Sequence, residues 1–215
     1  MTEIVIPILS YEINTTVRQY REEKLFTQEE FAFLIGRTVT EVMDCEDLTK
    51  GESYDLNFLN LFARILAKSP RDFLLNLHSP TPLVKVKATQ SRSQKHTTYK
   101  GTLTAKGVPI RQDHYHIAHT ATPPIPPADS EQVLQVLEAW LLEGFFRPGV
   151  TGLFLYETCL QHLAAGDQRI PKDFRPQHLI DALAVLSGRR KRPKLLPMRR
   201  APKTEEKWIL YQEDC

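Results

Sequence analysis

The stretch TQEEFAFLIG, residues 27–36, decides how the first part of the chain folds. Thr27 can cap a helix, because its hydroxyl can accept the backbone N–H of Glu30 while the Glu30 carboxylate reaches back to the N–H of Thr27. Gly36 follows the last apolar position and permits the positive φ that a tight turn after a helix requires. The pattern therefore predicts a short helix whose buried face consists of Phe31, Ala32, Leu34 and Ile35.

Further helices are predicted on both sides of this stretch. Thr38 can cap a second short helix, whose inner positions are Val42 and Cys45. Apolar residues at helical spacing predict longer helices before and after the pair: Ile13, Val17 and Tyr20 before it, and Leu56, Leu59, Ala63, Leu66, Phe73 and Leu74 after it. Two short capped helices, joined by a glycine turn and enclosed by longer ones, are typical of a helix-turn-helix.

The same region resembles a known family in its residues as well as its layout. The run comprises Arg21, Thr27 to Ala32, Leu34 to Gly36, Thr38, Val42 and Glu46. It resembles the phage-repressor-like (Cro or XRE) helix-turn-helix family over residues 11–77. The resemblance implies a buried ion pair between Arg21 and Glu46. It also implies that Gln28 and the start of the second short helix face the DNA major groove, and that a homodimer binds a pseudo-palindromic duplex.

The second short helix departs from that family in its charge. It carries no Lys or Arg, and the carboxylates in and just after it are Glu41, Asp44, Glu46 and Asp47. Phosphates repel carboxylates, and basic side chains supply most of the sequence-independent affinity for DNA. A glutamate can nevertheless accept a hydrogen bond from a cytosine amino group. Two interpretations stay open: a helix that reads DNA, and a module that serves packing, dimerisation or protein binding.

Charge is distributed unevenly along the chain. Residues 1–80 hold 8 basic and 13 acidic residues, a net charge of −5, whereas residues 81–128 hold 7 and 1, a net charge of +6. This asymmetry favours an anionic partner for the later parts of the chain. Residues 78–128 are also rich in Ser, Thr, Pro and His, which is typical of a linker. Weak alternation on both sides of Gly107 leaves a β-hairpin open as an alternative.

Three histidines in this stretch raise the question of a metal site. His114 and His116 would share one face of a strand, since alternate residues of a strand point the same way, and His119 and Asp113 are near in sequence. No Cys or carboxylate at a convincing spacing completes a ligand set. We interpret them as strand histidines, and we expect no metal and no other cofactor.

Residues 129–215 are again periodic and end in a basic segment. The pattern predicts three helices, the last of which begins at Pro176, and then two short strands joined by a basic loop. This order of elements is similar to that of a winged helix, in which the third helix and the loop would face the duplex. Between Arg189 and Lys207, nine basic and two acidic residues give a net charge of +7. Contact with phosphates and a solvated or protein-binding tail are both open for this segment.

Motifs for catalysis are missing from the sequence. Neither a GxxxxGK[ST] nor a GxGxxG phosphate loop occurs, and neither does GxSxG or HExxH. Cys45, Cys159 and Cys215 are odd in number and far apart, which favours a reducing compartment. No apolar run approaches the ~20 residues of a membrane-spanning helix, and the N-terminus has no basic n-region. We therefore expect a cytoplasmic protein that is not an enzyme.

These observations lead to one preferred prediction. The fold is expected to be mainly α: a five-helix repressor-like bundle at residues 1–77, a basic linker at 78–128, and a winged-helix-like domain of three helices and a short β-hairpin at 129–215. The expected function is that of a sequence-specific, DNA-binding transcriptional regulator. The alternative is an antitoxin-like or adaptor protein with a degenerate helix-turn-helix that binds another protein.

The residues expected to contact double-stranded DNA fall into two groups. Side chains at the helix-turn-helix would read the bases: Gln28, Thr38, Thr40 and Glu41. Basic side chains would contact the phosphates: Arg37, Lys50, Arg189, Arg190, Lys191, Arg192, Lys194, Arg199 and Arg200.

Overall fold

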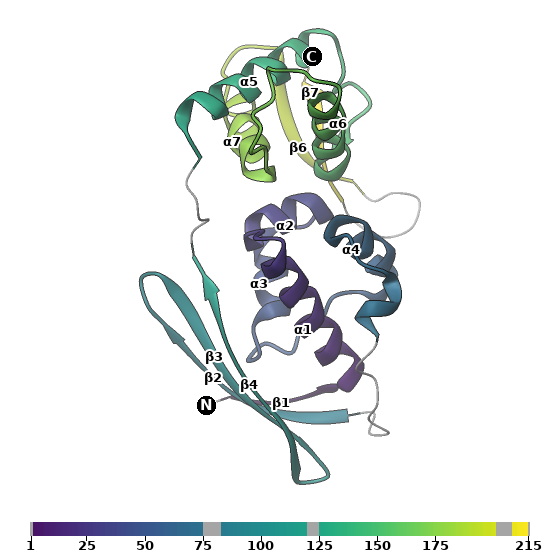
Figure 1. The fold of residues 1–215 in the computed structure, drawn as a ribbon, viewed down its shortest axis with the longest axis vertical. Coiled ribbons are helices and arrows are strands. Elements are labelled where there is room, and N and C mark those ends of the chain that lie inside the picture. The colour runs from purple at the N-terminus through teal and green to yellow at the C-terminus, as the bar shows by residue number, and fades with distance from the viewer. Residues whose placement is uncertain (1, 75–82, 120–124, 201–207, 215) are drawn as a thin grey trace. The chain divides into compact units, whose positions relative to one another are not determined.

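Helices and two antiparallel sheets make up the protein, whose structure is a computed structural model (Figure 1). The structure describes residues 2–74, 83–119, 125–200 and 208–214. The chain separates into two compact units: residues 1–31 with 39–122, and residues 32–38 with 123–215.

The expectation of a mainly α fold is wrong. Besides seven helices, the described residues form two antiparallel sheets with seven strands in total, and strands account for 27% of these residues. In the segment expected as a linker, Lys85 and Lys87 alternate with the buried residues Val84, Val86 and Ala88. A sheet with only one buried face needs an apolar side chain at every second position, so its strands can have a low mean hydropathy.

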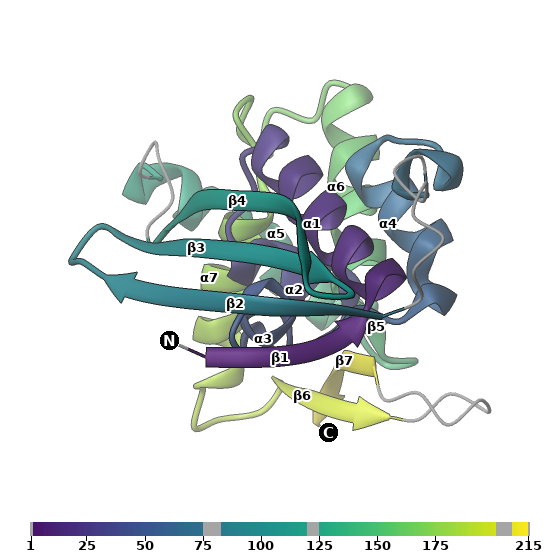
Figure 2. The ribbon, with the colours of Figure 1, turned by 90° about the horizontal axis from the view of Figure 1, so that it is seen from below.

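The first unit combines helices with a four-stranded sheet. The helices are α1 (Ile8–Glu23), α2 (Gln28–Ile35), α3 (Val39–Glu46) and α4 (Leu59–Leu66), with 3₁₀ turns η1 (Leu56–Phe58) and η2 (Pro70–Phe73). Because residues 32–38 group with the second unit, α2 contributes to both. The strands are β1 (Thr2–Pro7), β2 (Leu83–Arg92), β3 (His96–Ala105) and β4 (Val108–Ala118), in the order β1-β2-β3-β4 (Figure 2).

Long-range pairing builds this sheet. Thr2 lies opposite Ala88 and Pro7 opposite Leu83, so β1 joins strands that follow some eighty residues later. The inner face packs on α1, which crosses it in Figure 2. The buried cluster consists of Ile6, Tyr11, Val84, Val86, Ala88 and Leu103. The β-hairpin that the sequence allows around Gly107 is present as β3 and β4.

The helix-turn-helix stretch has the local geometry that its sequence predicts. The backbone N–H of Glu30 donates to Thr27 Oγ1 at 3.0 Å, and the N–H of Thr27 donates to Glu30 Oε2 at 2.8 Å. Gly36 has φ of +65°, a conformation that residues with a Cβ rarely adopt. The capping box and the glycine turn are therefore confirmed.

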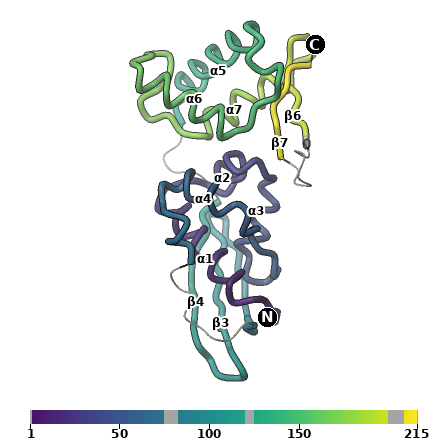
Figure 3. The backbone as a smooth tube through the Cα atoms, turned by 90° about the vertical axis from the view of Figure 1, so that its right-hand side faces the viewer, coloured from purple at the N-terminus to yellow at the C-terminus, as the bar shows by residue number. Residues whose placement is uncertain are grey.

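The described residues from 125 onward form three helices and a three-stranded sheet. Figure 3 labels the helices α5, α6 and α7 and the strands β6 and β7. The elements are α5 (Pro127–Leu142), β5 (Val150–Thr151), α6 (Gly152–Ala164), α7 (Pro176–Ser187), β6 (Lys194–Arg200) and β7 (Trp208–Asp214). The strand order is β5-β7-β6, and Thr151 of the unforeseen β5 pairs with Leu210. The Thr151 hydroxyl also caps α6 by accepting the N–H of Phe154 at 3.2 Å.

A buried imidazole stands at the start of α7. His178 is 2% exposed, and its Nδ1 lies 3.2 Å from the backbone N and O of Arg175. Its Nε2 has no hydrogen-bond partner among the described residues. Burial lowers the pKa of His178 below its ordinary value, although the carboxylates of Asp129 and Asp181 oppose the shift.

We expect His178 to make the second unit sensitive to acid. Because the pKa is lower in the folded state, stability should be complete above the ordinary histidine pKa of ~6.5 and should fall as the pH drops below it. His178→Asn, which does not titrate, should flatten this dependence. Both tryptophans, Trp140 and Trp208, lie in the second unit, so urea unfolding followed by tryptophan fluorescence at pH 7.5 and pH 5 measures the effect. If the variant loses as much stability as the wild type between pH 7.5 and pH 5, the acid sensitivity does not come from His178.

Candidate nucleic-acid interface

A buried ion pair holds α1 and α3 together. Arg21 Nε donates to Glu46 Oε1 at 2.6 Å and Arg21 Nη2 donates to Glu46 Oε2 at 2.7 Å. The Arg21 side chain is 4% exposed and that of Glu46 is 0% exposed. Two parallel hydrogen bonds of this kind fix the angle as well as the distance between the groups. The pair implied by the sequence resemblance is therefore confirmed.

Further donors complete the surroundings of the pair. Gln28 Nε2 donates to Glu46 Oε2 at 2.8 Å, and the Tyr54 hydroxyl lies 3.4 Å from Glu46 Oε1. Arg21 Nη1 donates to the carbonyl of Phe26 at 2.6 Å. Taking two charges out of water is costly unless hydrogen bonds satisfy their remaining atoms, and these bonds do so. The first residue of α2 is thereby tied to the last residue of α3.

The sheet of the first unit also contacts the end of α3. The Tyr115 hydroxyl of β4 donates to the backbone carbonyl of Glu46 at 2.5 Å. The guanidinium carbon of Arg18 lies 3.7 Å from the centre of the Tyr115 ring, a cation–π contact. Burial raises the pKa of Tyr115 and so keeps the hydroxyl protonated as a donor. The C-terminal end of α3 is thus fixed from two directions.

The other side of α3 remains accessible. Val39 is 39% exposed, Met43 is 46% exposed and Thr40 is also exposed, whereas Val42 between them is fully buried. Glu41 is half-buried and takes part in further interactions. The accessible side of α3 therefore carries apolar side chains, a hydroxyl group and carboxylates, and α3 contains no basic residue.

The residues predicted to read bases differ in their surroundings. Thr38 lies half-buried beside the turn, and Thr40 and Glu41 follow it in the first turn of α3. These three lie together, as the sequence interpretation requires. Gln28 differs, because its amide donates to the buried carboxylate of Glu46. Its position is one that orients α2 against α3.

The predicted phosphate contacts near α3 are few. Arg37 lies half-buried in the turn and has interaction partners. Lys50 follows α3 by four residues, with its side chain 55% exposed and its Nζ 3.7 Å from Asp44 Oδ1.

The basic segment of the second unit is partly neutralised by carboxylates. Arg189 forms an ion pair with Glu138. Arg192 Nη2 and Lys194 Nζ lie 3.2 and 3.3 Å from the carboxylate of Asp214. Arg190 and Lys191 are exposed between them, while the side chains of Arg199 and Arg200 lie outside the described part of the structure.

The sequence did not show that lysines of the β1–β4 sheet lie on one surface. Lys85, Lys87 and Lys100 are exposed on the side of the sheet that faces away from the helices. They look scattered in the sequence because Lys100 belongs to β3, whereas Lys85 and Lys87 belong to β2. The alternation of Lys85 and Lys87 with buried residues was the available signal, but the pairing with β3 was needed to bring Lys100 to the same face.

Metal and thiol chemistry have little support at these positions. Within the described ranges, no group of three or more His, Cys, Asp or Glu side chains could hold a metal ion. Burial, and next the carboxylate of Glu46, raise the pKa of Cys45 to about 12, so its thiol is protonated at neutral pH.

Comparisons with known proteins returned no match: no family model, no curated protein and no solved structure is similar to this chain. Among the described helices, none combines the length and the apolar content needed to cross a membrane.

The Arg21–Glu46 pair provides a test of how the first unit is held together. Glu46→Gln removes the bidentate partner of the buried Arg21 charge and leaves it only the carboxylate of Glu22, which lies 3.6 Å from Arg21 Nη2. Losing one partner of a buried pair costs roughly 3–5 kcal/mol. We expect the unfolding midpoint of the first unit to fall in a urea titration followed by far-UV circular dichroism. The double variant Arg21→Met with Glu46→Leu should recover much of the loss, since no charge then stays buried.

Tryptophan fluorescence gives the control for this measurement. Both tryptophans belong to the second unit, so its transition should stay in place in Glu46→Gln. A midpoint for Glu46→Gln that matches the wild type by circular dichroism would mean that the pair does not stabilise the first unit.

Proposed function

We propose that the protein is a sequence-specific DNA-binding regulator that acts as a homodimer. The observation that supports this most strongly is the combination of an anchored and an accessible side on α3. Its last residue, Glu46, is fixed by Arg21 and Gln28, while Val39 and Thr40 at its start are exposed. A rigid short helix with an accessible N-terminal half is the part that enters the major groove in helix-turn-helix proteins.

In this proposal the first turn of α3 reads the bases. Thr40 has a hydroxyl that can donate or accept and a methyl group that can contact thymine. Glu41 can accept from a cytosine amino group. Gln28 supports α3 from behind, because its amide is bonded to Glu46.

The basic segment of the second unit adds support of a weaker kind. Arg190, Lys191 and Arg192 are exposed between α7 and β6, and Arg192 is paired with Asp214. Arg190 and Lys191 would contact phosphates.

Thr40→Ala separates base reading from phosphate binding. We expect the variant to keep its affinity for random duplex but to select a different or more relaxed sequence from a random duplex pool, with discrimination at one base pair reduced about tenfold. Arg190→Gln with Lys191→Gln should do the opposite: the selected sequence stays the same, and the slope of log affinity against log salt falls by about 0.9 for each lost contact. If both Thr40→Ala and Glu41→Ala select the wild-type sequence with undiminished preference, the first turn of α3 does not read DNA.

A second function is favoured by the chemistry of the accessible side of α3. Exposed Val39 and Met43 beside Glu41 and Asp44 form an apolar patch with an acidic rim, which suits a basic protein. An adaptor or antitoxin-like role would then replace DNA reading.

A gel shift on random duplex at low salt distinguishes the two functions. Retention of the duplex, lost progressively with added salt, is expected for the regulator. Absence of a shift, together with a basic protein that co-purifies with the wild type and is lost from Met43→Lys, would establish the adaptor and overturn the regulator.

A further inference from the structure

The outer face of the β1–β4 sheet is a second surface with its own chemistry. Its side chains come from alternate positions of four strands, while the positions between them include the buried residues Val84, Val86 and Leu103, which point to the opposite face. Strand register places them in rows that cross the sheet: Glu3, Lys87, Thr102 and Gln112 in one row, and Thr89, Lys100 and His114 in the next.

Positive charge dominates this face among its described residues. Lys85 and Lys87 are each 46% exposed and lie about 7 Å apart along β2. The Glu3 carboxylate contacts both of them, at 2.6 and 3.3 Å. Lys100 and Lys106 are exposed farther along the sheet. Four ammonium groups against the Glu3 carboxylate leave an excess of three positive charges, since the Asp113 carboxylate is bonded to Arg111 and Tyr11.

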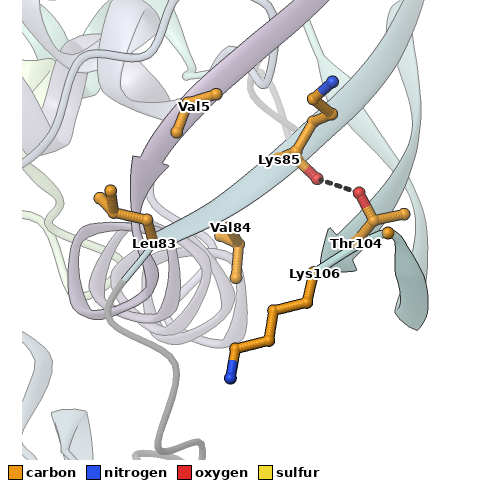
Figure 4. A pocket seen from close by; sticks show the side chains of 7 residues that line it. Val5, Leu83, Val84, Lys85, Thr104 and Lys106 are labelled. Atoms are coloured by element: carbon orange, nitrogen blue, oxygen red, sulfur yellow. Dashed lines mark hydrogen bonds between the residues drawn. The ribbon is translucent and has the colours of Figure 1, made fainter.

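The face is hollowed in two places. A larger hollow of about 500 Å³ is lined by Lys87, Thr89, Lys100, Thr102, Gln112 and His114, together with Gly101 and Asp113. A smaller one of about 290 Å³ lies at the other end of β2, and Figure 4 shows Val5 and Leu83 on one side of it and Lys85, Thr104 and Lys106 on the other. Each hollow therefore combines lysines with hydroxyl groups.

Aromatic rings continue the larger hollow along β4. The His114 and His116 rings have centroids 4.9 Å apart, and His116 lies 5.1 Å from His96 of β3. Neighbouring rings meet edge to face, at 63° and 88°, so each ring would stack with a base separately. Thr98 Oγ1 lies 2.8 Å from His116 Nδ1 and holds the middle ring. His114 and His116 are exposed, so this row offers ring surfaces beside the lysines.

We infer that the outer face of the β1–β4 sheet binds a single strand of DNA. The lysines would hold successive phosphates, and the imidazole row would stack with unpaired bases. A duplex fits less well, because its bases are stacked on one another and cannot lie on rings within a sheet surface. An acidic protein would match the lysines but gives no role to the row of rings. The choice of DNA over RNA rests on the proposed function, whereas the face itself does not depend on it.

Fluorescence anisotropy of the full chain with labelled (dT)20 tests this inference. Lys85→Gln, Lys87→Gln and Lys100→Gln together should weaken binding more than tenfold at low salt, and the slope of log affinity against log salt should fall by about 0.7 for each lysine that contacts a phosphate. His114→Ala with His116→Ala should weaken binding about tenfold and leave the salt slope unchanged, because stacking releases no counterions.

Matched controls distinguish this face from net charge and from α3. Lys24→Gln, Lys68→Gln and Lys172→Gln remove the same charge from elsewhere on the described surface and should retain most of the affinity. Thr40→Ala should bind (dT)20 like the wild type whatever happens to duplex selection, so the failure of one proposal is not the failure of the other. Circular dichroism checks that each variant is folded.

Four outcomes would overturn the inference. Equal weakening by the two lysine triples would mean that only net charge matters. If inorganic polyphosphate competes with labelled (dT)20 as well as unlabelled (dT)20 does, and the histidine changes have no effect, the face binds polyanions in general. Tighter binding of (U)20 would assign the strand to RNA, and duplex binding that falls in parallel in the same variants would assign the face to double-stranded DNA.

Discussion

The carboxylate of Glu46 accepts hydrogen bonds from Arg21 and Gln28, and its own backbone carbonyl accepts another from Tyr115. One residue at the end of α3 therefore connects α1, α2 and β4. A buried carboxylate tolerates no loss of these partners without a large cost in stability, so the position of α3 is tightly specified. An accessible surface can serve for recognition only if its support is rigid, and this network supplies that support.

Besides its apolar cluster, the contact between α1 and the sheet contains buried charged groups. Glu12 and Arg18 of α1 are buried, and they meet Arg111 and the Tyr115 ring of β4. The Tyr11 hydroxyl is hydrogen-bonded to Asp113. Apolar contacts alone would allow the sheet to slide along the helix, whereas these pairs match only in one register.

Sequence reasoning reached the parts of the fold that depend on neighbours in the chain. The Thr27–Glu30 capping box and the turn at Gly36 follow from residues within ten positions of one another, and both were predicted. The pairing of β1 with β2 depends on residues some eighty positions apart and was missed. Nothing in the sequence indicates that Glu12 and Arg18 of α1 have partners on β4.

The two candidate surfaces, α3 and the outer face of the sheet, also differ in whether they depend on neighbours in the chain or on strand pairing. Thr38, Thr40 and Glu41 could be placed together from the helix-turn-helix pattern, since they are adjacent in the chain. The surface that carries Lys87, Lys100 and His114 exists only through strand register, so composition revealed its charge but not its shape.

Methionine methyl NMR tests the central claim, that α3 contacts DNA, most directly. The chain has three methionines, of which Met43 is exposed on α3 and Met198 lies in β6 of the second unit. In a ¹³C-methyl-methionine sample titrated with the duplex selected from a random pool, the account predicts that the Met43 resonance shifts in proportion to the bound fraction. A saturated complex in which the Met43 resonance stays at its free position would contradict it.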